Sequence, residues 1–207
     1  MEQIELIRHA ALALDRLAVP YALVGSWGSG IYGEPRFTRD IDIVLDLNLA
    51  QLPQFCAAFP DDEFYLSEAA ARDAVRTGFQ FNVIHPGSGN KIDFILTRPD
   101  SWNANQLARR RRIELGHGQE AFDAYVAAPE DVILGKLWYF AEGGGDRHLR
   151  EYCWSPVRVS IEPRLSAGRR NWDTWKSGTK LWPKSMRPIA RGDRATHDGV
   201  FVPQAFS

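Results

Sequence analysis

The hydrophobic residues of this chain change their spacing several times within the first 150 residues, and each spacing predicts an element. Residues 3–18 place apolar side chains every three or four positions, which predicts an amphipathic helix; these side chains are Ile4, Ile7, Ala11, Leu14 and Leu17. Pro20 ends that helix because proline cannot continue it. A short apolar run then covers residues 21–24 and stops at Gly25, as expected of a buried strand that ends in a turn.

Further along, short apolar runs alternate with segments of helical pattern. We expect strands over 40–45, 79–84, 91–96 and 119–127, and helices over 49–59, 68–77, 101–115 and 129–142. Residues 85–90, His-Pro-Gly-Ser-Gly-Asn, are rich in turn formers and should join two of these strands in a hairpin. The pattern predicts an α/β fold with a small mixed β-sheet and flanking helices, which we expect mainly on one face.

Acidic residues interrupt two of the predicted strands. Asp40 and Asp42 are two positions apart, so their side chains face one way while Ile41 and Ile43 face the other. Two carboxylates so close repel each other unless a cation lies between them, and hard oxygen ligands suit Mg²⁺. Asp93 is the lone acid of a later apolar strand. The ordinary alternative has Asp40 at a strand end, Asp42 in solvent and Asp93 on an edge strand, but all three in this order favour a metal site.

The turn that precedes these acids is a candidate phosphate site. Gly25 lets the backbone turn or another group approach closely, and Ser26 can cap the helix that follows. Free backbone N–H groups at a helix start attract anions. The alternative is an ordinary strand-to-helix turn, but the position of Gly25 and Ser26 ahead of the acids favours phosphate binding. Arg36 and Thr38 flank the acids, where they either contact phosphate or stabilise the loop.

The ordered set of a strand, a Gly-Ser turn, a short helix, an Asp-x-Asp strand and a third acid on a later strand resembles the polymerase-beta-like nucleotidyltransferases. The resemblance covers about residues 1–150. Within that superfamily, the segments Gly33-Glu-Pro-Arg36-Phe-Thr38-Arg-Asp40 and Ala128-Pro-Glu-Asp131-Val-Ile-Leu-Gly-Lys136-Leu resemble small bacterial AbiEii-type and antitoxin-type proteins. Lys136 resembles a lysine that lies close to the nucleotide in AbiEii-type proteins. A lysine that extends along the margin of the core is an equally good interpretation.

The resemblance implies a nucleotidyltransferase-like fold and Mg²⁺-dependent transfer of a nucleoside monophosphate from an NTP to a hydroxyl on a protein or an RNA such as tRNA. Two Mg²⁺ ions would be bound by the catalytic residues Asp40, Asp42 and Asp93, and the nucleotide by Gly25, Ser26, Arg36, Thr38 and Lys136. The setting would be a toxin–antitoxin or phage-defence system with a cognate toxin or antitoxin. The alternative function is a non-catalytic, antitoxin-like module that neutralises a partner by contact.

Composition is that of an ordinary globular protein, with 44% hydrophobic and 25% charged residues. The chain has no run of about 18 apolar residues, so we expect no membrane span. The acidic start, Met1-Glu-Gln-Ile-Glu, lacks the basic region of a signal peptide. Cys56 and Cys153 form no Cys-x-x-Cys pair, so nothing indicates a zinc ribbon or a disulfide framework. We therefore expect a cytoplasmic protein without a membrane partner.

The composition changes near residue 150, which predicts a domain boundary there. Residues 151–207 contain ten Lys and Arg against five Asp and Glu, so they carry a net charge of +5 while residues 1–150 carry −6. Four of the seven tryptophans lie in this tail without helical or strand spacing. Two interpretations remain: a frameshifted or otherwise foreign end of low order, with impaired activity, or a divergent extension that packs on the domain or binds a partner. Composition and lost periodicity favour the first.

Arg109-Arg-Arg-Arg112 is a basic run that invites an RNA-binding interpretation. On the predicted helix, four consecutive residues face all sides, so they cannot all contact one ligand. The acidic domain around the run also opposes broad affinity for nucleic acid. A charged surface helix is therefore the favoured interpretation.

Overall fold

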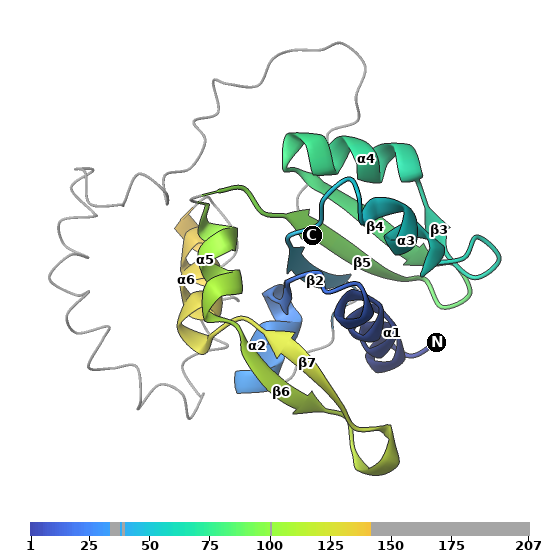
Figure 1. Ribbon diagram of the computed structural model, residues 1–207. Helices are drawn as coiled ribbons and strands as arrows, with labels where there is room; N and C mark the ends of the chain where they lie inside the picture. The colour runs from blue at the N-terminus through green and yellow to red at the C-terminus, as the bar shows by residue number, and fades with distance from the viewer. Residues whose placement is uncertain (34–37, 39, 100, 142–207) are drawn as a thin grey trace, which may run out of the picture.

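The computed structural model describes residues 1–33, 38, 40–99 and 101–141 of the chain (Figure 1). Arg36 and the tail of residues 151–207 lie outside the described residues, and so does the predicted boundary near residue 150. The expectations for these parts stay predictions.

The described residues form six α-helices, one short 3₁₀ helix and seven strands. The helices are α1 (Gln3–Arg16), α2 (Gly25–Tyr32), α3 (Leu52–Ala57), α4 (Glu68–Thr77), α5 (Trp102–Arg109) and α6 (Pro129–Ala141), with the 3₁₀ helix at Gly118–Glu120. The strands are β1 (Tyr21–Leu23), β2 (Asp40–Leu45), β3 (Tyr65–Leu66), β4 (Gln80–His85), β5 (Asn90–Leu96), β6 (Arg111–Leu115) and β7 (Phe122–Val126).

All seven strands belong to one mixed sheet with the order β3-β4-β5-β2-β1-β7-β6. Parallel pairs are β2 with β5 and β1 with β7, and the remaining neighbours are antiparallel. The predicted hairpin joins β4 to β5. The predicted mixed α/β fold is confirmed, and it places β2 and β5 inside the sheet with a partner on either side.

One face of the sheet carries the larger core. Isoleucines of β2 and the phenylalanine of β5 point to this face, where α1, α3 and α4 cover them; the residues are Leu6, Leu14, Ile41, Ile43, Phe55, Ala71 and Phe94. Ser67 caps α4 by accepting a hydrogen bond from the Ala70 N–H, and Gly78 ends the helix in the left-handed conformation. These local signals were visible in the sequence and position α4 as expected.

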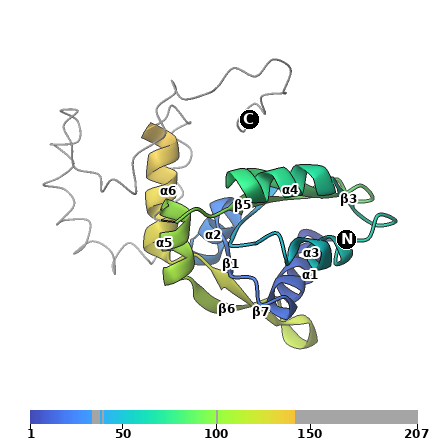
Figure 2. The same cartoon turned by 45° about the horizontal axis from the view of Figure 1, so that its top comes forward.

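The opposite face is covered by α2, α5 and α6, which lie together and apart from α1, α3 and α4 in both views (Figure 1 and Figure 2). A second cluster, formed by Ala22, Val24, Val44, Leu107, Ala127 and Val132, packs these helices onto the sheet. The prediction that the helices lie mainly on one face is therefore wrong. The physical reason is that the second face also carries apolar side chains, such as Ala22 and Val44, which need a cover.

The predicted helix over 101–115 is also wrong in its second half. Ser101 caps α5 by accepting from the Ala104 N–H, but the helix ends at Arg109, and Arg110 is extended with φ −55° and ψ 150°. The following residues form β6, which pairs antiparallel with β7. Unpaired N–H and C=O groups on the edge of β7 are satisfied by this pairing, and that gain overrides a local helical pattern.

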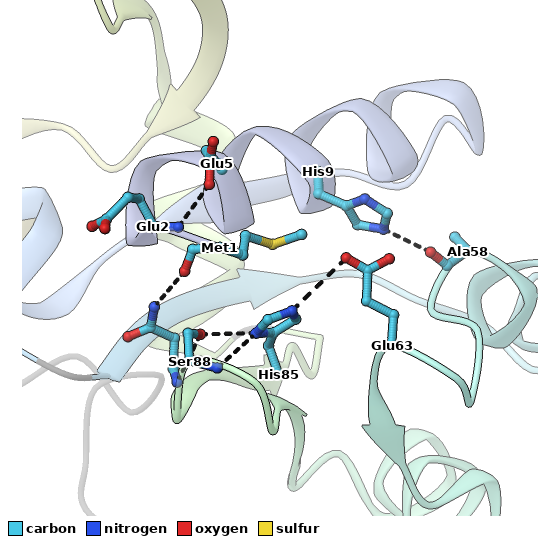
Figure 3. Close-up of polar contacts among 9 residues, drawn as sticks. Met1, Glu2, Glu5, His9, Ala58, Glu63, His85 and Ser88 are labelled. Atoms are coloured by element: carbon cyan, nitrogen blue, oxygen red, sulfur yellow. Dashed lines mark hydrogen bonds and ion pairs between the residues drawn. The ribbon is translucent and has the colours of Figure 1, made fainter.

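A polar cluster fixes the turn between β4 and β5 (Figure 3). His85 Nδ1 lies 2.9 Å from Ser88 Oγ and accepts a hydrogen bond from the Ser88 N–H at 3.1 Å. Asn90 Nδ2 donates to the carbonyl oxygen of Met1 at 3.0 Å. These contacts hold the beginning of β5, where Lys91 follows, against the first residues of the chain.

Candidate active site

Three carboxylates share the face of the sheet that α2 covers. In the parallel pairing of β2 and β5, Asp42 lies opposite Asp93 and Asp40 lies opposite Lys91. Paired positions on neighbouring strands point to the same face, and so do positions two apart on one strand. The structure therefore brings Asp40, Asp42 and Asp93 together. Asp93 lies on an interior strand and is buried, so the edge-strand alternative is wrong.

Burial and mutual repulsion raise the pKa values of the inner acids. Burial raises the pKa of Asp42 to about 6, the charges of Asp93 and Asp40 add to the rise, and Lys136 and Lys91 oppose it. Burial likewise raises the pKa of Asp93, against the hydrogen bond and charge of Lys91. Acids whose pKa values are raised by burial and mutual repulsion are a favourable environment for a cation.

Gly25 brings the turn between β1 and α2 directly against Asp42. A Cβ atom at this position would lie 1.9 Å from Oδ2 of Asp42, far inside any permitted contact. The backbone N–H of Val24 also donates to the carbonyl oxygen of Asp42 at 3.0 Å. The candidate phosphate turn and the Asp-x-Asp strand thus meet at one point, and the lack of a side chain at Gly25 leaves the acid accessible.

Lys136 approaches the same turn from α6. Its Nζ donates to Ser26 Oγ at 3.4 Å, although the side chain is buried. Its charge also lowers the pKa of Asp42. The structure therefore brings Ser26 and Lys136 to the acids, so the ammonium of Lys136 ends at the site and not in solvent.

Thr38 has a main-chain role in the structure. Its Oγ1 donates to the carbonyl oxygen of Asp40 at 3.2 Å, and its own carbonyl oxygen accepts from Gln3 Nε2 at 2.5 Å. These contacts stabilise the segment that leads into β2. Of the two roles left open for Thr38, the described contacts support the stabilisation of the loop.

Lys91 is a member of the site that the sequence interpretation missed. Its Nζ lies 2.9 Å from Asp93 Oδ2 and 3.4 Å from Asp40 Oδ1. Burial lowers the pKa of Lys91, but the hydrogen bonds and charges of these two acids outweigh burial, so the pKa lies above its ordinary value. Its position two residues before Asp93 could have indicated the shared face. The contact with Asp40 depends on the register between β2 and β5.

Asn82 extends the polar row to the next strand. It lies opposite Asp93 in the antiparallel pair of β4 and β5, and it is exposed, as Gln80 is on the same strand. Asn82, Asp93 and Asp42 therefore follow one another across three strands on one face. The sequence shows Asn82 only as a polar position in a strand, so this neighbour was also missed.

The cofactor implied by the resemblance, Mg²⁺, fits the donor set in charge and in chemistry. The three carboxylates share one face of the sheet, Asp42 lies directly against Gly25, and carboxylate oxygens are preferred ligands of Mg²⁺. Within the described residues, no group of three or more His, Cys, Asp or Glu side chains is spaced to hold a metal in this conformation. Asp40 and Asp93 instead contact the ammonium of Lys91.

The basic run 109–112 has partners within the protein. Arg109 forms an ion pair with the fully buried Asp131, and Arg112 Nε lies 3.1 Å from Asp123 Oδ2. Arg110 lies over the ring of Tyr125, with Cζ 4.6 Å from the ring centroid. The run spans the end of α5 and the beginning of β6, so it is not one helical surface. Its contacts connect these elements to α6 and β7.

No family model and no curated protein matches the sequence. Among solved structures, ANT(2″)-Ia in complex with adenylyl-2″-tobramycin matches with a TM-score of 0.50 and 14% identity, over 82% of this chain and 98% of that one. An antigenic nucleotidyltransferase-like protein from Paracoccidioides brasiliensis matches with a TM-score of 0.47 and 19% identity, over 72% of each chain.

The similarity to ANT(2″)-Ia concerns the fold. The described part of the chain has an α/β fold of the nucleotidyltransferase type, with a seven-stranded mixed sheet and flanking helices. The broad resemblance deduced from the sequence is confirmed at the level of this fold. In the portion of the chain that the structure describes, no helix has the length and apolar character needed to cross a membrane.

Proposed function

We propose that the protein is a Mg²⁺-dependent nucleotidyltransferase that moves a nucleoside monophosphate from an NTP to a hydroxyl group. The observation that carries the proposal is that Asp40, Asp42 and Asp93 share one face of a nucleotidyltransferase-type fold, with Asp42 directly against the Gly25 turn. Two Mg²⁺ ions, when bound, would neutralise charge on the attacking and leaving oxygens. Asp40, Asp42 and Asp93 are the residues that would hold them.

The remaining residues of the site would bind and orient the NTP. Backbone N–H groups after Gly25, together with Ser26 Oγ, would donate to phosphate oxygens, and Lys136 would add a positive charge beside them. A bond forms between the acceptor oxygen and the α-phosphorus, the bond to the β-phosphate breaks, and pyrophosphate leaves. The carboxylate of Asp93 would accept the hydroxyl proton. Its exposed neighbour Asn82 would orient the acceptor hydroxyl from β4.

The acceptor that we propose is a protein or an RNA, including tRNA, in the cytoplasm, within a toxin–antitoxin or phage-defence system of the AbiEii type. A cognate toxin or antitoxin would then be the partner. The rival is a non-catalytic antitoxin-like module. A binding module does not require three acids on one face of the sheet, with Asp42 against the Gly25 turn and Lys136 beside it, so the arrangement of the site supports catalysis.

A transfer assay with matched variants tests the proposal. The protein is incubated with Mg²⁺ and each of the four α-³²P-labelled NTPs, separately with total protein, total RNA, or a set of small hydroxyl compounds that includes tobramycin. We expect label on one pool from the preferred NTP, and no label with Asp42→Asn or Asp93→Asn. Asp46→Asn is the control, because Asp46 is an exposed acid just beyond the end of β2.

Two results would contradict catalysis at these acids. One is the absence of label in every pool with every nucleotide, which would favour the binding module. The other is equal labelling by the wild type and Asp42→Asn, which would place the chemistry elsewhere. Label on the small compounds alone would replace the macromolecular acceptor with a small-molecule one.

A further inference from the structure

The ammonium of Lys91 lies between two acids of the proposed metal site. Its Nζ is within ion-pair distance of both Asp93 Oδ2, at 2.9 Å, and Asp40 Oδ1, at 3.4 Å. The position follows from the fold, because Lys91 precedes Asp93 by two residues on β5 and lies opposite Asp40 on β2. One positive charge is thus already located where Asp40 and Asp93 could share a cation.

We propose that Lys91 is the resident counter-ion of this site. It keeps the acids together in the metal-free protein, it competes with free divalent cations for Asp40 and Asp93, and it transfers to the phosphates when metal and nucleotide bind together. The inference rests on the proposed function for the identity of the nucleotide. Its first two parts concern only this chain and a cation.

The charges around the site require such a role. Asp42 is repelled by both other acids, and the two lysines that offset this repulsion are Lys136 and Lys91. Lys136 is directed to Ser26 at the turn, whereas Lys91 contacts the carboxylates themselves. A cation shared by Asp40 and Asp93 must therefore displace the ammonium of Lys91.

Displacement of the Lys91 ammonium costs more free energy when free metal binds than when a metal–nucleotide complex binds. An ammonium that loses two carboxylate partners at a partly buried site needs another anion or full hydration. The triphosphate of an NTP supplies that anion, and lysine can follow it because its four-carbon stem is flexible and its side chain is 31% exposed. Metal and nucleotide should consequently strengthen each other's binding, as linkage requires.

Titration with MnCl₂ alone tests the inference without any transfer reaction. Free Mn²⁺ is measured by electron paramagnetic resonance in the presence of the wild type, Lys91→Met, Lys91→Gln and Lys91→Arg. We expect Lys91→Met and Lys91→Gln to bind Mn²⁺ at least about tenfold more tightly than the wild type, because a like charge has been removed. Lys91→Arg keeps the charge and should bind as weakly as the wild type.

Arg16→Met is the matched control, since it removes one positive charge on the last turn of α1, where Arg16 Nε donates to the carbonyl oxygen of Leu12 in the same helix. Its Mn²⁺ affinity should equal that of the wild type. Thermal unfolding provides a second measurement, in which Lys91→Gln should melt below the wild type without metal and gain more from added Mn²⁺.

The inference is overturned if Lys91→Met and Lys91→Gln bind Mn²⁺ no more tightly than the wild type, or if Arg16→Met gains as much as they do. Failure of the proposed function has a different signature. In that case no NTP labels any acceptor, while the dependence of Mn²⁺ affinity on the charge at position 91 persists.

Discussion

Gly25 and Asp42 approach each other so closely that no side chain fits between them. A Cβ atom on Gly25 would lie 1.9 Å from Oδ2 of Asp42 and 2.8 Å from its Cγ. Gly25 also has a φ of +60°, a conformation in which residues with a Cβ atom are strained. One glycine thus serves both the turn and the acid, so a ligand bound to the N–H groups of the turn would also be in reach of Asp42.

Replacement of Gly25 by alanine should disrupt both features. We expect Gly25→Ala to lower the free energy of unfolding by about 2–4 kcal/mol, since the left-handed conformation and the clash with Asp42 each contribute, and to abolish transfer. Gly89→Ala is the matched control: Gly89 has a φ of +69°, and a Cβ atom there would meet nothing within 4 Å. It should cost only about 1–2 kcal/mol. Equal losses in urea unfolding would show that the contact with Asp42 contributes nothing.

The raised pKa of Asp42 predicts a pH-dependent gain in stability when its charge is removed. The folded protein holds the proton of Asp42 up to a pKa of about 6, whereas the ordinary value is 3.8, so ionised Asp42 destabilises the fold above pH 6. We expect Asp42→Asn to raise the free energy of unfolding at pH 7.5 by up to about 3 kcal/mol. The gain should shrink as the pH falls from 6 to 4.

Unfolding in urea with EDTA, at pH 7.5 and at pH 4.5, measures this difference. Asp46→Asn provides the comparison, because Asp46 is exposed and follows the same strand. A stability loss in Asp42→Asn at pH 7.5 would mean that the Asp42 carboxylate is a structural hydrogen-bonding group.

Side-chain alternation explains why the acids could be located from the sequence. A strand places every second residue on one face, so the apolar partners of Asp42 and Asp93 determine which way these acids point. Lys91 obeys the same rule, but its significance depends on Asp40, which is 51 positions away in the chain. That contact requires the parallel register of β2 and β5, and no local pattern specifies which strands pair.

The basic run shows the opposite case, in which a local pattern misled. Residues 101–115 have a helical spacing, yet the second half pairs with β7 because that strand offers an unpaired edge. The four arginines then separate into different environments. Asp131, the buried partner of Arg109, lies 22 positions away, and a charge run in the sequence does not reveal a buried partner.

The Arg109 pair should be far more important for stability than the Arg112 pair. Arg109→Met leaves the fully buried Asp131 without its cation and should cost about 3 kcal/mol at pH 7.5. Arg112→Met breaks an ion pair whose two side chains are both about half exposed, and it should cost at most about 1 kcal/mol. Because burial already raises the pKa of Asp131, the loss in Arg109→Met should diminish at low pH as this acid becomes protonated. Urea unfolding of both variants at two pH values makes the comparison, and similar losses would contradict it.

Lys136 should act on the site without supporting the fold. Its ammonium is buried beside Ser26 and lowers the pKa of Asp42, so Lys136→Met should move that pKa above about 6 in the metal-free protein. Transfer should fall by about tenfold or more, because a positive charge near the phosphates is lost. The free energy of unfolding should change little, since the removal of a costly buried charge offsets the added destabilisation by ionised Asp42. Carboxylate resonances followed by ¹³C NMR report the pKa, and the labelled-NTP assay reports transfer.

Lys136→Arg keeps the charge and should retain a wild-type pKa at Asp42. Loss of transfer in Lys136→Met with an unchanged Asp42 pKa would instead assign Lys136 to a role away from the acids.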